Sequence, residues 1–279
     1  MLGLMEKTRC ILKGPLHNLL SYKRNIFSQN GEDGIIKRIF ETIGIERAIC
    51  CEFGAWDGIH LSNCRQLILQ GWKGIMIEGD AAKYSQLAQT YAGNGRVQCI
   101  NAFVDSVTNK LSRVASGGEV SDLDFLSIDI DGLDYEILEG LDVTPRVICI
   151  EVNAGHNPLS QDRLPRSIAQ DNIGQPLGLF SEIAKAKGYG LICYTGNAFY
   201  VRHDVLTRFG IASKSDLDAY TEFLGALSVM EREWLYLVSK GLNPPYFKFG
   251  NPYLSGQQLN IPLFRMPTLL VSAWSKLPR

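Results

Sequence analysis

Several features that would settle the class of this 279-residue protein at once are missing. No apolar run reaches the length that spans a membrane, and no N-x-[ST] glycosylation sequon is present. The seven cysteines form no C-x-x-C pair, and an odd count without a pairing framework favours a reducing compartment. The net charge of −1 gives no general reason to expect nucleic acid as a partner. We therefore expect a soluble cytoplasmic protein with no membrane span.

The charge is unevenly distributed along the chain. Residues 1–25 hold five basic residues against one acid, which gives +4, and residues 240–279 hold five basic residues and no acid, which gives +5. The middle therefore carries −10, since −1 − 4 − 5 = −10. An acidic middle part of the chain with basic ends suits an anionic substrate that is held by the ends. Basic termini that are simply solvated would give the same pattern.

The periodicity of apolar residues predicts alternating strands and helices. Five apolar strands are expected at 48–53, 73–79, 96–104, 124–129 and 146–152. Helices are expected at 33–44, 62–72, 81–93, 107–115, 133–141 and 176–190. A hairpin of 190–195 and 198–202 then makes the last strand antiparallel. This pattern predicts an α/β, Rossmann-like, mostly parallel sheet covered by helices on both faces.

The predicted organisation has three parts. Residues 1–25 form a basic N-terminal segment, 26–204 the α/β domain, and 205–279 a C-terminal extension. Residues 205–240 have a helical pattern, and the rest is loop-rich, with six of the eleven prolines after residue 240. The extension is either packed on the domain or an interface arm, and a homo-oligomer is left open.

The turn "CEFGAWDG" (51–58) follows the first strand and lacks both common phosphate-binding patterns. It contains no lysine, as a P-loop requires, and its spacing is G-x-x-x-G, not G-x-G-x-x-G. Glu52 precedes the turn and Asp57 lies inside it, and two carboxylates repel a pyrophosphate but attract a cation. S-adenosylmethionine, with an ammonium, a sulfonium and no phosphate, is such a ligand.

Ligands of such sheets bind outside the carboxyl ends of the strands, and here those ends are acidic. Glu78 ends the second strand, twenty residues after Gly58, where a carboxylate can accept both hydroxyls of a ribose. A purely structural strand-to-helix turn on a domain that binds another nucleotide is the alternative.

Four segments together resemble one known family. "SQNGEDGII", "CEFGAWDG", "GWKGIMIEGD" and "DFLSIDIDGLDYEIL" are similar to the FkbM-type branch of class I S-adenosylmethionine-dependent methyltransferases, over roughly residues 26–155. The resemblance implies a seven-stranded sheet and methyl transfer, commonly to a hydroxyl of a sugar or natural product. The family loop is altered here by Trp56, and the residues after 203 match no family pattern.

The resemblance also implies which residues bind the cofactor. The methionine part would be lined by Glu52, Gly54 and Asp57, the ribose would meet Glu78 and Gly79, and the adenine would lie near Phe103 and Asp105. Asp129 would complete this set.

Two further segments are candidates for cofactor contact. "SQNGED" (28–33) could place Ser28, Gln29 and Asp33 over the cofactor as a lid, or Ser28 could simply cap the next helix. Asn63, at the start of the following helix, could reach the cofactor carboxylate through helix N-terminal amides.

A divalent metal is a further hypothesis. Asp129, Asp131, Glu151 and Asn153 end two neighbouring strands, and their alternation puts each pair on one face. They resemble the magnesium site of catechol-type O-methyltransferases, and hard oxygen ligands suit Mg²⁺ or Mn²⁺. The catalytic candidates are accordingly Asp129 and Asp131 with a metal, or His156 as general base without one.

The acceptor is inferred from polarity. Residues 153–175 form a long polar connection with Arg163 and Arg166, which fits a lid over a hydrophilic or anionic substrate. We expect an O-methyltransferase of a sugar or sugar nucleotide. A methyltransferase of a non-sugar natural product, an NAD-dependent sugar-nucleotide oxidoreductase and a non-catalytic module are the alternatives.

Overall fold

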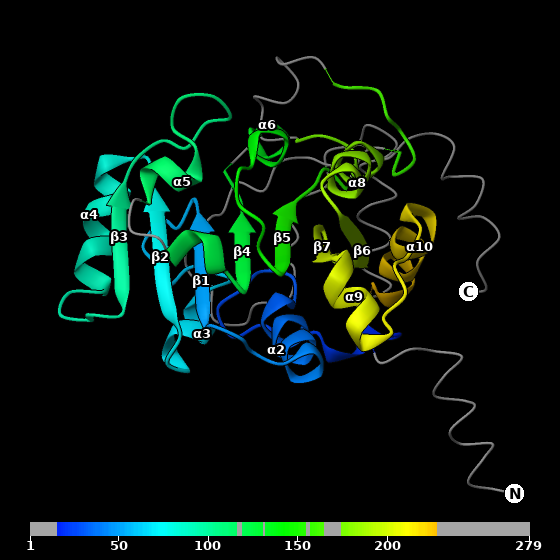
Figure 1. Cartoon of the computed structure of the whole chain (residues 1–279), viewed down its shortest axis with the longest axis horizontal. Helices are drawn as coiled ribbons and strands as arrows, with labels where there is room; N and C mark the ends of the chain where they lie inside the picture. The colour runs from blue at the N-terminus through cyan, green and yellow to red at the C-terminus, as the bar shows by residue number, and fades with distance from the viewer. Residues whose placement is uncertain (1–15, 116–118, 131, 155–156, 165–173, 228–279) are drawn as a thin grey trace, which may run out of the picture.

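The computed structural model describes residues 16–115, 119–130, 132–154, 157–164 and 174–227. Seven strands form one sheet in the order β3-β2-β1-β4-β5-β7-β6 (Figure 1). They are β1 (Ile49–Phe53), β2 (Lys73–Glu78), β3 (Val97–Asn101), β4 (Phe125–Ile128), β5 (Val147–Glu151), β6 (Tyr189–Tyr194) and β7 (Asn197–Arg202). β1 to β5 pair in parallel, and β7 is antiparallel to β5 and β6. The predicted Rossmann-like α/β fold with an antiparallel last strand is confirmed.

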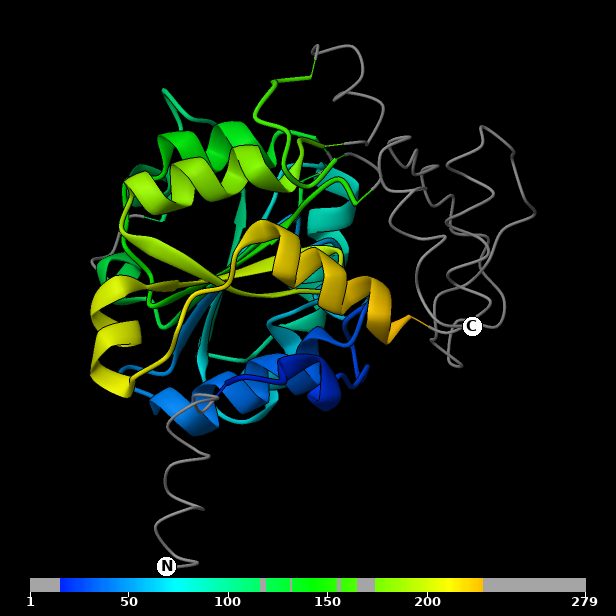
Figure 2. The same cartoon turned by 90° about the vertical axis from the view of Figure 1, so that its right-hand side faces the viewer.

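Helices cover both faces of the sheet, which explains why β1 and β6 are buried along their whole length. One face packs on η1 (Leu19–Tyr22), α2 (Glu32–Ile43), α3 (Arg65–Leu69), α4 (Ala81–Thr90) and α9 (His203–Phe209). The other packs on α5 (Leu111–Val114), η2 (Glu119–Asp122), α6 (Asp134–Gly140), α8 (Leu177–Ala186) and α10 (Asp216–Ala226). Figure 2 shows α2 and α8 on opposite sides of the sheet. Among the helices described, none has the length and apolarity needed to cross a membrane.

The polar side chains near the carboxyl ends of the strands share one face. Residues two apart in a strand point to the same side. The residues two positions before Glu52, Glu78, Ser127 and Glu151 all belong to the core under α2, α3 and α4. These four side chains therefore lie on the α2 side of the sheet. The face predicted to be shared by Glu151 and Asn153 stays a prediction.

A buried ion pair fixes the opposite, amino-terminal edge. Asp124 is fully buried and accepts hydrogen bonds from the backbone amides of Arg47 and Ala48, both at 2.7 Å. Arg146 donates to Asp124 at 2.7 Å and to the carbonyls of Ile43 and Gly44, at the end of α2, at 2.9 Å. This network links the end of α2 and the start of β1 to the starts of β4 and β5, so it fixes the relative positions of these elements.

Two helices begin later than the sequence predicts, for one physical reason. The helix predicted at 62–72 begins at Arg65, because Ser62 and the amide of Asn63 are bound to Glu52. The helix predicted at 107–115 begins at Leu111, because Asp105 holds the amides of residues 107–109 in a turn. Side chains outside each helix thus occupy amides that periodicity alone assigns to it.

The expected helical stretch at 205–240 is interrupted. α9 ends at Gly210, which has a φ of +62°, and α10 begins after Ser215, whose hydroxyl accepts from the Asp218 amide. α9 packs on β6 and β7, and α10 packs on β6 and α8. Residues 228–279 and 1–15 lie outside the described ranges, so the three-part division remains a prediction.

Candidate functional site

The turn after β1 packs directly against the end of β4. Gly54 has a φ of +68°, and a Cβ at this position would lie 1.9 Å from the carbonyl oxygen of Asp129. Only glycine fits this approach, because the conformation is left-handed and the space is filled by backbone. Gly54 itself is exposed, so a ligand can reach its backbone.

Glu52 anchors the start of α3. It is buried and accepts from the Ser62 hydroxyl at 2.5 Å and from the Asn63 amide at 2.6 Å. Burial raises the pKa of Glu52 to about 7, against the lowering effect of these hydrogen bonds. The carboxylate predicted to line the methionine part of the cofactor therefore already holds the 62–63 segment.

Asn63 points inward from the same segment. Its Nδ2 donates to the Ser127 hydroxyl on β4 at 3.0 Å, while its buried Oδ1 accepts no hydrogen bond from any residue that the structure describes. Ser62 was not among the predicted site residues, although its place at the start of the helix predicted at 62–72 was a signal for it, since serine favours helix N-termini. The cap serves Glu52 on the strand as well as the helix.

Glu78 lies at the tip of β2, beside β1. It is buried, and it accepts from the Trp56 amide at 2.9 Å and the Asp80 amide at 2.8 Å. Phe103 lies against the next residue, since a Cβ on Gly79 would come within 2.5 Å of its ring. The ring is 74% exposed, so it presents an open aromatic surface next to Glu78.

The "SQNGED" segment is locked to α2. Asp33 Oδ2 accepts from the amides of Ile26, Phe27 and Ser28 and from the Ser28 hydroxyl, all at 2.8 Å. The Ser28 hydroxyl in turn accepts from the Asp33 amide, in the first turn of α2, at 3.0 Å. The N-cap residue itself is Gly31 and not Ser28, so Ser28 serves the helix start from outside the predicted cap position. Gln29 is half-buried. These contacts order the segment, and the lid role predicted for it stays a prediction.

Glu32, at the first position of α2, joins distant parts of the chain. It is fully buried and accepts from the Thr195 hydroxyl at 2.8 Å and from Asn197 Nδ2 at 3.2 Å, at the turn between β6 and β7. Burial raises its pKa, against several hydrogen bonds that lower it. No signal in a single sequence identifies partners this far apart.

Asp57 and Asp105 each hold a surface turn. Asp57 accepts from the amides of Ile59 and His60 at 2.9 and 2.8 Å and pairs with the His60 ring. Partial burial raises the pKa of Asp57, but the hydrogen bonds from His60 and Ile59 outweigh it and the pKa is lowered. Asp105 accepts from the amides of residues 107–109. These hydrogen bonds lower the pKa of Asp105, and the bond from the Asn109 amide has the largest effect. Both carboxylates are oriented by their own loops.

Three of the four predicted metal ligands, Asp129, Glu151 and Asn153, are among the described residues. Ile128 pairs with Ile150, so Asp129 and Glu151 directly follow paired positions of neighbouring strands. Asn153 is buried two residues later. Asp131 and His156 lie outside the described residues. Among the residues described, no cluster of three or more His, Cys, Asp or Glu side chains could hold a metal ion.

Arg163, predicted to meet an anionic substrate, contacts α6 instead. Its Nη2 lies 2.6 Å from Glu136 Oε1, and its guanidinium lies 5.0 Å from the centre of the Tyr135 ring. The described part of the long connection, 157–164, is thereby held against α6. Arg166 lies outside the described residues.

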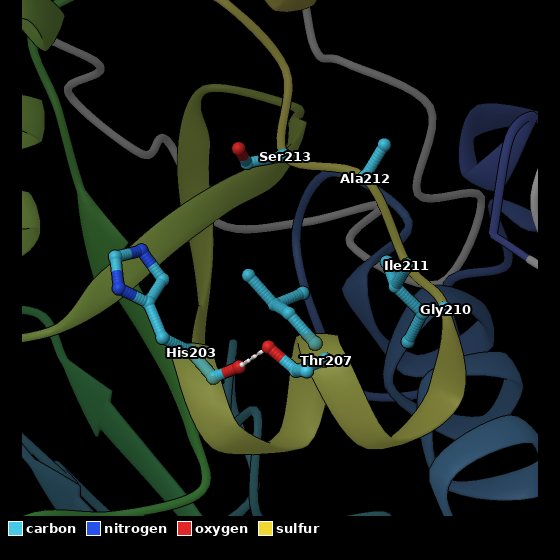
Figure 3. A pocket seen from close by; sticks show the side chains of 7 residues that line it. His203, Thr207, Gly210, Ile211, Ala212 and Ser213 are labelled. Carbon is cyan, nitrogen blue, oxygen red and sulfur yellow. Dashed lines mark hydrogen bonds between the residues drawn. The ribbon is translucent and has the colours of Figure 1, made fainter.

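One hollow of about 520 Å³ lies elsewhere, along α9 and residues 210–213 (Figure 3). His203 and Thr207 line it, and the Thr207 hydroxyl donates to the His203 carbonyl at 2.8 Å. α9 follows β7, which runs antiparallel to β5, so the hollow lies at the amino-terminal edge. It is therefore remote from the strand ends that carry Glu52 and Glu78.

No protein-family model matches the sequence, and no curated protein matches it at a significant level. Similar solved structures include the CMeT domain of the citrinin polyketide synthase, with 9% identity, a TM-score of 0.41, and coverage of 61% of this chain and 51% of that one. A putative sarcosine dimethylglycine methyltransferase from Galdieria sulphuraria has 15% identity, a TM-score of 0.40, and coverage of 57% and 60%. A TehB-like SAM-dependent methyltransferase from Corynebacterium glutamicum has 15% identity, a TM-score of 0.38, and coverage of 71% and 94%. This chain thus spans about half of the first of these proteins. Identities and TM-scores this low say nothing of what this chain does.

Proposed function

We propose that this protein is an S-adenosylmethionine-dependent O-methyltransferase that acts on a hydroxyl of a sugar or sugar nucleotide. The observation that carries the proposal is the pairing of two strand tips. The exposed glycine turn at Gly54 ends β1, and the carboxylate of Glu78 ends β2 beside it, next to the open ring of Phe103.

These groups match the parts of the cofactor. The exposed backbone at Gly54 allows close approach of a ligand, and the acidic surroundings favour its ammonium and sulfonium. Each oxygen of Glu78 accepts one amide hydrogen bond and keeps a further lone pair, so the carboxylate can still accept from ribose hydroxyls. Phe103 offers a flat surface to the adenine. A pyrophosphate seated on the Gly54 turn would meet Glu52 and Glu78 and be repelled, which disfavours NAD in the cofactor site.

The transfer step needs an acceptor oxygen that has lost its proton. A metal-free route uses His156 as general base. In the other route, Asp129, Asp131, Glu151 and Asn153 would hold Mg²⁺ or Mn²⁺, since three carboxylates and an amide are hard oxygen donors. The ion would lower the pKa of the acceptor hydroxyl and orient it.

Calorimetry on the full chain tests the proposal. S-adenosylhomocysteine and NAD are titrated separately, each with and without EDTA. We expect S-adenosylhomocysteine to bind one to one and NAD not to displace it. Binding of NAD alone would favour a sugar-nucleotide oxidoreductase instead, and binding of neither would leave a non-catalytic module.

A further inference from the structure

The Trp56 side chain contacts two basic residues that follow it in the sequence. Its ring contacts Lys83, at the start of α4, whose Nζ lies 5.1 Å from the ring centre. It also lies 6.0 Å from the His60 ring, at an interplanar angle of 37°. The indole is only half-buried. Trp56 thus lies among basic side chains on the outer side of the turn.

The backbone of Trp56 is unusual for a residue of its size. Its φ is +47°, in the left-handed region that bulky side chains rarely adopt. Glycine or asparagine would fit this conformation without the same penalty. Backbone of this kind persists where surrounding contacts impose it, and here the Trp56 amide is bound to Glu78. The indole is therefore present at a position where the backbone itself favours a smaller residue.

Three groups are available to a ligand at this position. The indole offers a flat aromatic surface. Within the described part of the chain the Lys83 ammonium is in no ion pair, and it lies over the indole ring. The His60 side chain is 45% exposed, and Asp57 fixes its orientation. An aromatic surface with an ammonium and an imidazole suits a planar ring that carries phosphate.

We propose that Trp56, Lys83 and His60 form a recognition platform for the nucleoside diphosphate part of a sugar-nucleotide acceptor. The base stacks on Trp56, and Lys83 and His60 bind the phosphates. The inference rests on the proposed function, since it names the acceptor class of that reaction. A neutral sugar would leave Lys83 without a role, and an uncharged planar natural product would not call on either basic group.

The platform is joined to the candidate cofactor site through one contact. The Trp56 amide donates to Glu78, the carboxylate proposed for the ribose. The acceptor would thus be held beside the cofactor and not on top of it. Loss of the Trp56 ring should therefore weaken the binding of the acceptor and leave the binding of the cofactor unchanged.

Calorimetric titration with uridine diphosphate tests the platform on the full chain saturated with S-adenosylhomocysteine. Trp56→Asn suits the left-handed backbone, so the variant should fold and bind S-adenosylhomocysteine as the wild type does. We expect it to bind uridine diphosphate at least tenfold more weakly, and Trp56→Phe to recover most of the affinity. Lys83→Met should also bind uridine diphosphate at least tenfold more weakly, whereas the surface control Lys37→Met should bind it as tightly as the wild type does.

Three results would overturn the platform: no binding of uridine diphosphate at millimolar concentration, unchanged binding by both Trp56→Asn and Lys83→Met, or equal affinity for inorganic pyrophosphate. The cofactor titration separates this failure from failure of the proposed function. Loss of uridine diphosphate binding with S-adenosylhomocysteine still bound refutes only the platform. Binding of uridine diphosphate without S-adenosylhomocysteine supports the platform and refutes the methyltransferase.

Discussion

The backbone amide of Trp56 donates to Oε2 of Glu78 at 2.9 Å, so the tip of β2 holds the turn that follows β1. The same carboxylate, through its other oxygen, holds the amide of Asp80 at the start of α4. One buried side chain therefore sets the positions of both segments that border the candidate cofactor site.

Glu78→Gln should weaken the binding of S-adenosylhomocysteine. The amide keeps the size of the carboxylate but loses its charge and one acceptor, and hydrogen bonds to charged groups contribute about 1.5–3 kcal/mol. We expect a loss of about 10- to 100-fold in affinity by calorimetry. Glu41→Gln, on the exposed face of α2, is the matched control. Equal affinities for the two variants would remove Glu78 from the cofactor site.

Gly54→Ala should be far more damaging than Gly93→Ala. Both glycines have a positive φ, +68° and +77°, but only Gly54 is blocked, with Asp129 carbonyl oxygen 1.9 Å from the added Cβ. Gly93→Ala should be destabilised only by about 1–2 kcal/mol, the cost of a left-handed backbone for a residue with a Cβ. Gly54→Ala should lose more stability in urea unfolding, together with cofactor binding. Similar free energies of unfolding for both variants would contradict the close packing of β1 on β4.

Glu52 should make stability fall as pH rises from about 4.5 to 7. Its folded pKa, about 7, is above its ordinary value of 4.5, so the folded state holds its proton over this interval while the unfolded state releases it. The loss is at most about 3 kcal/mol, from 1.36 kcal/mol per pKa unit. Glu52→Gln removes the titrating group. Its free energy of unfolding should therefore change less with pH than that of the wild type, and parallel curves would contradict the raised pKa.

Arg146→Met should destabilise the fold by about 3–5 kcal/mol, because it leaves the buried Asp124 carboxylate without its cation. Arg208→Met, which removes an exposed pair with Glu46, should cost less than about 1 kcal/mol. Urea unfolding measures both. Affinity for S-adenosylhomocysteine should stay the same at temperatures where the variants are folded, since this network lies at the amino-terminal edge.

If a metal serves the reaction, EDTA should abolish turnover and Mg²⁺ or Mn²⁺ should restore it. Asp131→Ala should also lose turnover while S-adenosylhomocysteine binding is largely kept. Metal content of the purified protein and calorimetry provide the two readouts. Turnover that survives complete chelation would leave His156 as the remaining candidate base, and His156→Ala should then be inactive.

The sequence predicts the frame of this protein better than the contacts of its polar groups. Apolar runs identify all seven strands, because six of them are buried along all or nearly all of their length and must be largely apolar. The edge strand β3 is only half-buried and is identified by its three apolar residues alone. The glycine pattern identifies the turn at Gly54. The bonding of Glu52 to Ser62 and Asn63 depends on how the loop of residues 54–64 folds back, which periodicity does not encode. The direction of Trp56 follows from a positive φ at a non-glycine residue, which sequence patterns do not predict.

The contacts of Glu32 have a consequence for the order of assembly. Its partners Thr195 and Asn197 lie 163 and 165 residues later in the chain. During synthesis the chain emerges from its N-terminus, so α2 is available long before the turn that completes its buried end. Contacts with this sequence separation are slow to form because loop closure must precede them. On the ribosome, the buried end of α2 therefore stays unfinished until almost the entire sheet has been translated.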